Sequence, residues 1–217
     1  MRLPSHIDRE EFANSLSHSI GLLAAMAAAP LLMWAAVPAQ RSTAGIIGVC
    51  IFTLTMVMLY AASVLCHALP PGRAREVFLK LDHGLIYVFI AGTYTPFALG
   101  VAQDAAGWML FGLIWALAAL GFLLKMIGRL SSPVVSTGSY LLIGWLVLVA
   151  VHPLIDSLTC AAFQWLVLGG IIYTIGVVFF VVGAKLRYGH LVWHLFVMAG
   201  TTCHFLAVLW SATPAQI

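Results

Sequence analysis

The chain has 217 residues, of which 63% are hydrophobic and 8% are charged, and its formal net charge is +3. Soluble globular domains contain roughly 45–50% apolar and about 25% charged residues, so this composition excludes a water-soluble fold and a separate catalytic or nucleic-acid-binding domain outside the membrane. The 10 Lys and Arg residues are spread along the chain, which argues against a patch that binds a polyanion. The composition therefore predicts a single domain, residues 1–217, within a lipid bilayer.

Apolar stretches separated by charge, Pro and Gly predict seven transmembrane helices, because a span needs about 20 mostly apolar residues. Lipid tolerates only helices or closed barrels, and the strand-period alternation of a barrel is absent. In chain order, the predicted spans are residues 16–37, 43–69, 78–101, 107–127, 134–151, 159–184 and 190–210, after a short cytoplasmic segment at residues 1–15. The predicted fold class is an all-α integral membrane protein, and glycines within the spans, such as Gly92 and Gly121, predict close helix packing.

The basic residues predict how these spans are oriented. Nine of the 10 Lys and Arg residues fall on the side of the amino terminus, and only Arg41 falls on the other side. Because cytoplasmic loops carry an excess of Lys and Arg, we expect a cytoplasmic amino terminus and an outside carboxyl terminus. The first span is longer than the core of a signal peptide, about 7–15 residues, and follows Asp8, Glu10 and Glu11, so we expect it to be retained.

Polar residues gather at the predicted cytoplasmic ends of three spans, where ionisable groups usually face the interior of a bundle. His190 and His194 lie one turn apart on one face of the seventh span, which suits two ligands of one zinc ion and is equally compatible with polar packing at a helix end. His67 ends the second span, Ser63 shares its face, and Asp82 begins the third span. Three imidazoles with one open position form the ligand set of a catalytic zinc, so the pattern favours a zinc site.

The remaining histidines in the spans have other expected roles. His83 points about 100° away from Asp82 on its helix. His204 lies about 15 Å beyond His194 along the seventh span, which is too far to share an ion, so we expect it to form a buried hydrogen bond between helices or to line a cavity. His18, with Glu11 and Asn14, forms a polar face leading into the first span and is interpreted as part of a structural network, with substrate access or a contact to the metal ligands as the alternative.

Several motifs occur in order along nearly the whole chain. They are EFANSLSH at residues 11–18, SVLCH at 63–67, LDHGLIY at 81–87, IAGTYTPF at 90–97 and HLVWH at 190–194, followed by HF at 204–205. Together they resemble the hemolysin III branch of the progestin and adipoQ receptor (PAQR) family, the seven-helix proteins that include the adiponectin receptors. The compact chain is similar to bacterial members, which implies the bacterial inner membrane.

The resemblance also implies the roles of particular residues. It implies zinc as cofactor, held by His67, His190 and His194, with Ser63 and Asp82 close to the metal. This chain departs from the pattern at Cys66, where related sequences often carry an aromatic residue.

Three functions remain open from the sequence. The leading hypothesis is a zinc-dependent hydrolase of amide or ester bonds in a membrane lipid or fatty-acyl substrate. In this hypothesis Asp82 accepts a proton from the zinc-bound water or orients that water, and Ser63 positions the water or stabilises the oxyanion. Resemblance to the wider superfamily, which includes alkaline ceramidases, implies amide hydrolysis. The alternatives are a regulator of membrane lipid state with a structural zinc, and a pore-forming hemolysin. A retinal protein is excluded because the seventh span contains no lysine.

Overall fold

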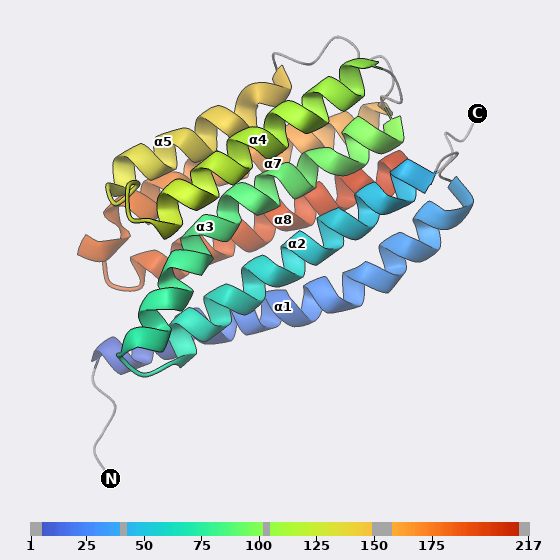
Figure 1. Cartoon of the computed structure of the whole chain (residues 1–217). Coiled ribbons are helices and arrows are strands. Elements are labelled where there is room, and N and C mark those ends of the chain that lie inside the picture. The colour runs from blue at the N-terminus through green and yellow to red at the C-terminus, as the bar shows by residue number, and fades with distance from the viewer. Residues whose placement is uncertain (1–5, 40–42, 102–104, 149–157, 213–217) are drawn as a thin grey trace.

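The computed structural model describes residues 6–39, 43–101, 105–148 and 158–212, and every regular element among them is helical. The long helices are α1 (His6–Ala39), α2 (Thr43–Ala68), α3 (Arg73–Pro96), α4 (Ala105–Met126), α5 (Pro133–Gly144), α7 (Cys160–Val182) and α8 (Gly189–Ala212). A π-helical turn at Phe97–Val101 continues α3, and 3-10 turns follow α5 at Trp145–Leu148 and α7 at Gly183–Lys185. The helices lie side by side in one bundle (Figure 1).

Within the described ranges, 6 helices are long and apolar enough to cross a membrane, which makes the chain a multi-pass membrane protein. The exception is α5, a helix of 12 residues that ends at Gly144. With its 3-10 turn it extends about 26 Å, slightly less than the hydrocarbon core of about 30 Å. The last residues of the predicted fifth span, 149–151, lie outside the described residues.

The order of the helices places the first and the last helix of the chain side by side. Helix α1 packs against α2 on one side and α8 on the other. In Figure 1, α1 begins at the end of the bundle where α2 ends and where α3 and α8 begin, whereas α8 ends at the opposite end. The polar residues predicted for the site therefore meet at one end of the bundle.

Helix α1 begins at His6, well before the first predicted span at residue 16. The sequence predicted a short cytoplasmic segment at residues 1–15 before that span. In the structure, Asn14 and His18 are instead buried on the inner face of α1, while Phe12, Leu16 and Ile20 on the outer face are exposed. The helix therefore extends because its polar face has partners inside the bundle.

Two glycines show how closely the helices pack. A Cβ atom added to Gly92 of α3 would overlap the Thr55 hydroxyl of α2, and one added to Gly121 of α4 would lie 2.5 Å from the Tyr87 ring of α3. These positions therefore admit only glycine without movement of a neighbour. The close packing expected at these two glycines is present in the structure.

Candidate metal centre

Three histidines from two helices converge at the end of the bundle where α1 begins. His67 lies in the last turn of α2, and His190 and His194 lie in the first two turns of α8. Their ligand nitrogens all lie within 4.8 Å of one another. The ring centroids of His67 lie 5.1 Å from His190 and 5.0 Å from His194, and those of His190 and His194 lie 4.6 Å apart. This donor set could hold a metal ion.

His67 presents one ring nitrogen to this cluster. Its Nδ1 lies 2.7 Å from Glu11 Oε2, and a neutral imidazole donates its proton to such a carboxylate. Its Nε2 is buried and has no hydrogen-bond partner among the described residues. A buried acceptor without a partner is costly. A metal ion would satisfy it, and the carboxylate contact on the other nitrogen is the arrangement common to metal-binding histidines.

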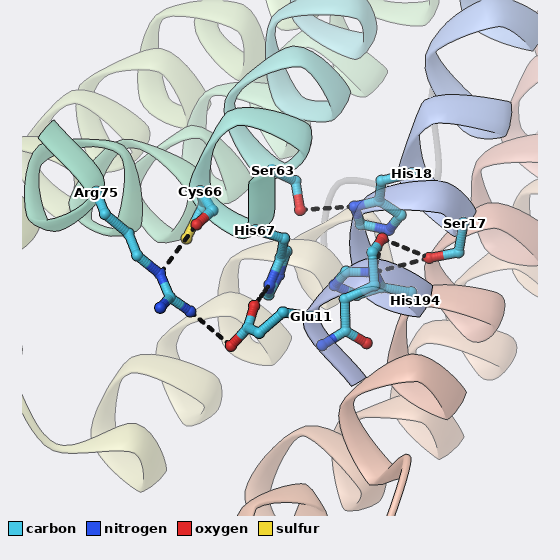
Figure 2. A network of polar contacts seen from close by, with 9 residues as sticks. Glu11, Ser17, His18, Ser63, Cys66, His67, Arg75 and His194 are labelled. Carbon is cyan, nitrogen blue, oxygen red and sulfur yellow. Dashed lines mark hydrogen bonds and ion pairs between the residues drawn. The ribbon is translucent and has the colours of Figure 1, made fainter. Parts of the chain in front are cut away.

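Glu11 is itself held by Arg75. The guanidinium donates to Glu11 Oε1 at 2.5 Å and to the carbonyl oxygen of Cys66 at 3.1 Å. Figure 2 shows Glu11 between the His67 ring and the Arg75 side chain. The sequence placed Glu11 only in a polar face of the first helix and did not identify it as the partner of His67.

His194 is fixed in a similar way by α1. Its Nδ1 lies 3.0 Å from Ser17 Oγ and 3.2 Å from the carbonyl oxygen of Asn14. Because Ser17 donates its own hydroxyl proton to Asn14, the His194 Nδ1–H is the donor in both contacts. This leaves the lone pair of His194 on Nε2. His67 and His194 therefore adopt the same tautomer, with Nε2 available to a ligand.

His18 links α1 to both ligand-bearing helices. Its ring stacks on His194 with centroids 3.5 Å apart, and its Nδ1 lies 2.7 Å from Ser63 Oγ (Figure 2). Its Nε2 is buried without a hydrogen-bond partner in the described chain. The polar network expected on the first helix is thus present. This network also contacts the candidate ligand His194, a contact that the sequence analysis gave only as the alternative role of His18.

Ser63 and Asp82 complete the predicted cluster. Ser63 is fully buried, and its hydroxyl contacts His18 Nδ1 and lies near the Asp82 carboxyl. Donor atoms of Cys66, His67 and Asp82 lie within 4.8 Å of one another, which makes a second group that could hold a metal and that shares His67 with the first. All five predicted site residues therefore lie together. The sequence marked Cys66 only as a departure from the family pattern and did not predict its place beside Asp82.

Two further histidines of the predicted spans, His83 and His204, lie apart from these groups. The His83 ring packs edge-on against Phe180, with centroids 5.5 Å apart. His204 Nε2 lies 3.3 Å from the carbonyl oxygen of Leu166 on α7. His204 also lines a cavity, so both expected roles of this residue are present.

This cavity is an apolar space of about 120 Å³ between α3, α5, α7 and α8. Aromatic and aliphatic side chains make up most of its wall. Trp193, which precedes His194 in α8, is part of that wall, so the cavity approaches the histidine cluster along α8. Its apolar lining suits a hydrocarbon chain.

Comparison with known proteins shows the family of this chain. Residues 7–205 match the family described as "Haemolysin-III related". The chain is 37% identical to "Hemolysin-3" of Bacillus cereus over 207 residues, covering 95% of this chain and 93% of that protein. It is 38% identical to "Hemolysin-3 homolog" of Bacillus subtilis (strain 168) over 203 residues, 93% of each chain. It is also 31% identical to human "Monocyte to macrophage differentiation factor" over 135 residues, covering 60% of this chain and 54% of that protein.

Proposed function

The chain belongs to the haemolysin-III-related family, and from that premise we propose that it is a zinc-dependent hydrolase of amide or ester bonds in membrane lipids. The observation that carries the proposal is the convergence of His67, His190 and His194, with the buried Nε2 of His67 lacking a protein partner. Three neutral imidazoles leave a coordination position of zinc open to water, as in catalytic rather than structural zinc sites.

The surrounding residues have distinct roles in this proposal. A zinc ion held by the three histidines would supply Lewis acidity and water with a pKa near about 7. Asp82 accepts a proton from the attacking water, because its carboxyl oxygen lies beside His67. Ser63 donates its hydroxyl hydrogen to the carbonyl oxygen of the substrate as negative charge develops there. Glu11 and Ser17 hold His67 and His194 in the required tautomer.

The apolar cavity supports a fatty-acyl substrate. Its wall includes Trp193 and Val197 on the same helix as His194, so an acyl chain in the cavity would place its head near the cluster. The distribution of basic residues supports a cytoplasmic level for the cluster, and the bacterial relatives support an inner-membrane location.

Metal analysis of the purified protein tests the donor set. We expect about one zinc per chain in the wild type, and loss of that zinc in His67→Ala and in His194→Ala, because each removes one of three ligands. His83→Ala is the matched control and should retain zinc, since its ring packs on Phe180 outside the cluster. Retention of zinc by both ligand variants would refute the donor set.

Turnover tests the hydrolase. Wild-type protein incubated with N-acyl and ester lipids should release fatty acid, and Asp82→Asn should keep zinc while losing most of this release. A zinc-loaded wild type that hydrolyses neither class of lipid would contradict the proposal and favour the non-enzymatic regulator with a structural zinc.

A pore-forming activity is a second candidate because two bacterial relatives carry the name hemolysin. Leakage of an entrapped dye from vesicles that contain the purified protein tests for this pore. Dye release that depends on protein concentration would support a pore, whereas tight vesicles would exclude one under those conditions.

A further inference from the structure

A second cavity, of about 250 Å³, lies beside the candidate metal centre and plays no part in the proposed hydrolysis. Lys80 and His83 near the start of α3, Lys125 at the end of α4, and Ser131 in the segment that joins α4 to α5 contribute its polar groups. Phe180 of α7 forms part of its wall. The lining thus combines two cations with two neutral hydrogen-bonding side chains, and it contains no acidic residue.

Lys125 is partly buried in this cavity without a counter-charge. Its ammonium group donates to the carbonyl oxygen of Leu130 at 3.0 Å and to Ser136 Oγ at 3.2 Å, and both acceptors are neutral. An ammonium group has three donors, and no third partner is present in the described chain. The described ion pairs involve His67, Arg75 and Glu11 only. Lys125 is therefore a cation that an anion in the cavity would stabilise.

Lys80 adds a second uncompensated positive charge at the mouth of the cavity. Glu76 lies four residues before Lys80 on α3, at a spacing that permits an ion pair, but the two side chains form none in the structure. The two lysines come from different helices and line the same space. The cavity thus has the charge and the hydrogen-bond donors that a phosphate group requires, since lysines bind phosphate as point charges.

We propose that this cavity binds the phosphate of an anionic phospholipid headgroup, contacted by Lys80 and Lys125 with hydrogen bonds from His83 and Ser131. Apolar surface beside the cavity favours a lipid as the source of the phosphate, because Ile127, Val134 and Val135 near the adjoining ends of α4 and α5 are exposed. Acyl chains can lie against that surface while the headgroup enters the cavity. Basic pockets between helices on the cytoplasmic side of a membrane bind anionic headgroups in this way.

The proposed phosphate site shares one wall with the metal centre. The Phe180 ring lies 5.5 Å from the His83 ring, between centroids, and 6.3 Å from the His190 ring. A bound headgroup would therefore restrict the Phe180 side chain, which lies between the phosphate site and His190. The phosphate site does not depend on zinc or on hydrolysis, so it can be tested with lipid binding alone.

Binding of phosphatidylglycerol to the full chain in neutral detergent, followed by native mass spectrometry, tests the site, with phosphatidylcholine as the zwitterionic comparison. We expect the wild type to bind phosphatidylglycerol in preference to phosphatidylcholine, and Lys80→Gln/Lys125→Gln to weaken that binding by at least about tenfold. Lys185→Gln is the matched control. Lys185 is exposed before α8 and does not line the cavity, so its loss should change binding by less than about twofold.

The single variant Lys80→Gln shows whether weaker binding reflects a lost contact or a folding defect. Lys80 is exposed, so its replacement should not change the melting temperature. It should weaken phosphatidylglycerol binding in the same direction as the double variant. Addition of millimolar inorganic phosphate separates the two sources of the anion: displacement of the lipid would assign the cavity to free phosphate, and retention would assign it to the headgroup. Unchanged binding in both lysine variants, or an equal loss in Lys185→Gln, would overturn the proposal.

Discussion

Two single side chains on the first helix determine which nitrogen two of the three candidate ligands offer. Glu11 accepts the Nδ1 proton of His67, and Ser17 accepts that of His194. The two contacts leave Nε2 of both rings as the lone-pair donor. The carboxylate also fixes the orientation of the ring that it contacts, so Glu11 would contribute to metal affinity without touching the metal.

Replacing Glu11 with Gln tests this contribution. The amide can still accept a hydrogen bond, but it lacks the negative charge that binds Arg75 and polarises His67. We expect zinc affinity to fall about 10–100-fold, measured by competition with a chromophoric chelator. Glu10→Gln removes the same charge from the neighbouring position and should leave the affinity unchanged. Equal affinities in the two variants would show that Glu11 does not support the ligand.

At the scale of the helices, glycine contacts set how closely neighbouring spans approach. Gly92 faces Thr55 at the contact of α3 with α2, whereas Gly112 of α4 has no atom within 4 Å of the position of an added Cβ. Both residues lie inside long helices. Alanine substitutions at these two positions therefore separate two effects on stability: the packing of one helix against another, and the intrinsic preference of a helix for alanine over glycine.

We expect Gly92→Ala to destabilise the protein by about 1–3 kcal/mol, because the new methyl group must displace Thr55. Gly112→Ala should leave stability unchanged or raise it by up to about 1 kcal/mol, because alanine lowers the entropy lost on helix formation. Thermal unfolding of both variants in the same detergent measures the difference. A melting temperature for Gly92→Ala at or above that of Gly112→Ala would contradict the packing seen between α2 and α3.

The spans were the most predictable part of the fold, because each needs only sufficient apolar length. Helix α2, predicted at residues 43–69, runs from Thr43 to Ala68. The start of α1 was not predictable from hydrophobicity, since Asn14 is polar and becomes buried only through partners on α2 and α8. Helix α5 also ends early, at Gly144, within a stretch whose hydropathy continues unchanged.

The candidate site was predictable where helix periodicity sufficed. The spacing of His190 and His194 placed both on one face, and the ends of the spans placed His67 and Asp82 at the same level. The partners of these residues could not be derived in the same way. The contact of Glu11 with His67 joins residues 56 positions apart, so it depends on how α1 packs against α2 and not on any local pattern.

At the scale of the whole molecule, helix α1 begins at one end of the bundle and helix α8 ends at the opposite end (Figure 1). With the excess of basic residues on the first side, we expect a cytoplasmic amino terminus.

Reporter fusions in a bacterial host measure this orientation. A fluorescent protein fused before residue 1 should fold and fluoresce in the cytoplasm, and alkaline phosphatase fused after residue 217 should be active outside. Alkaline phosphatase fused after Gly72, between α2 and α3, serves as the internal control and should be inactive. An active fusion after Gly72 would reverse the orientation.

A bound ion would also affect global stability, because His67 belongs to α2 while His190 and His194 belong to α8. We expect chelation of zinc to lower the melting temperature of the wild type, corresponding to about 3 kcal/mol at zinc concentrations 100 times the dissociation constant. His194→Ala should show no such dependence on chelator. A wild type whose melting temperature is insensitive to zinc and chelator would argue against a metal that joins the two helices.

The contacts of α1 with α8 also determine when the centre can form during synthesis. Ser17 and His194 are 177 positions apart, and His18 stacks on the same ring. At translation rates of about 5–20 residues per second, the first helix is complete many seconds before its partner leaves the ribosome. Asn14 and Ser17 of α1 therefore remain without their α8 partner until the last helix inserts, whereas Glu11 and His18 already have partners on α2. The three histidines of the candidate centre come together only at that step, so a chain truncated before α8 would lack two of them and leave Ser17 without its histidine partner.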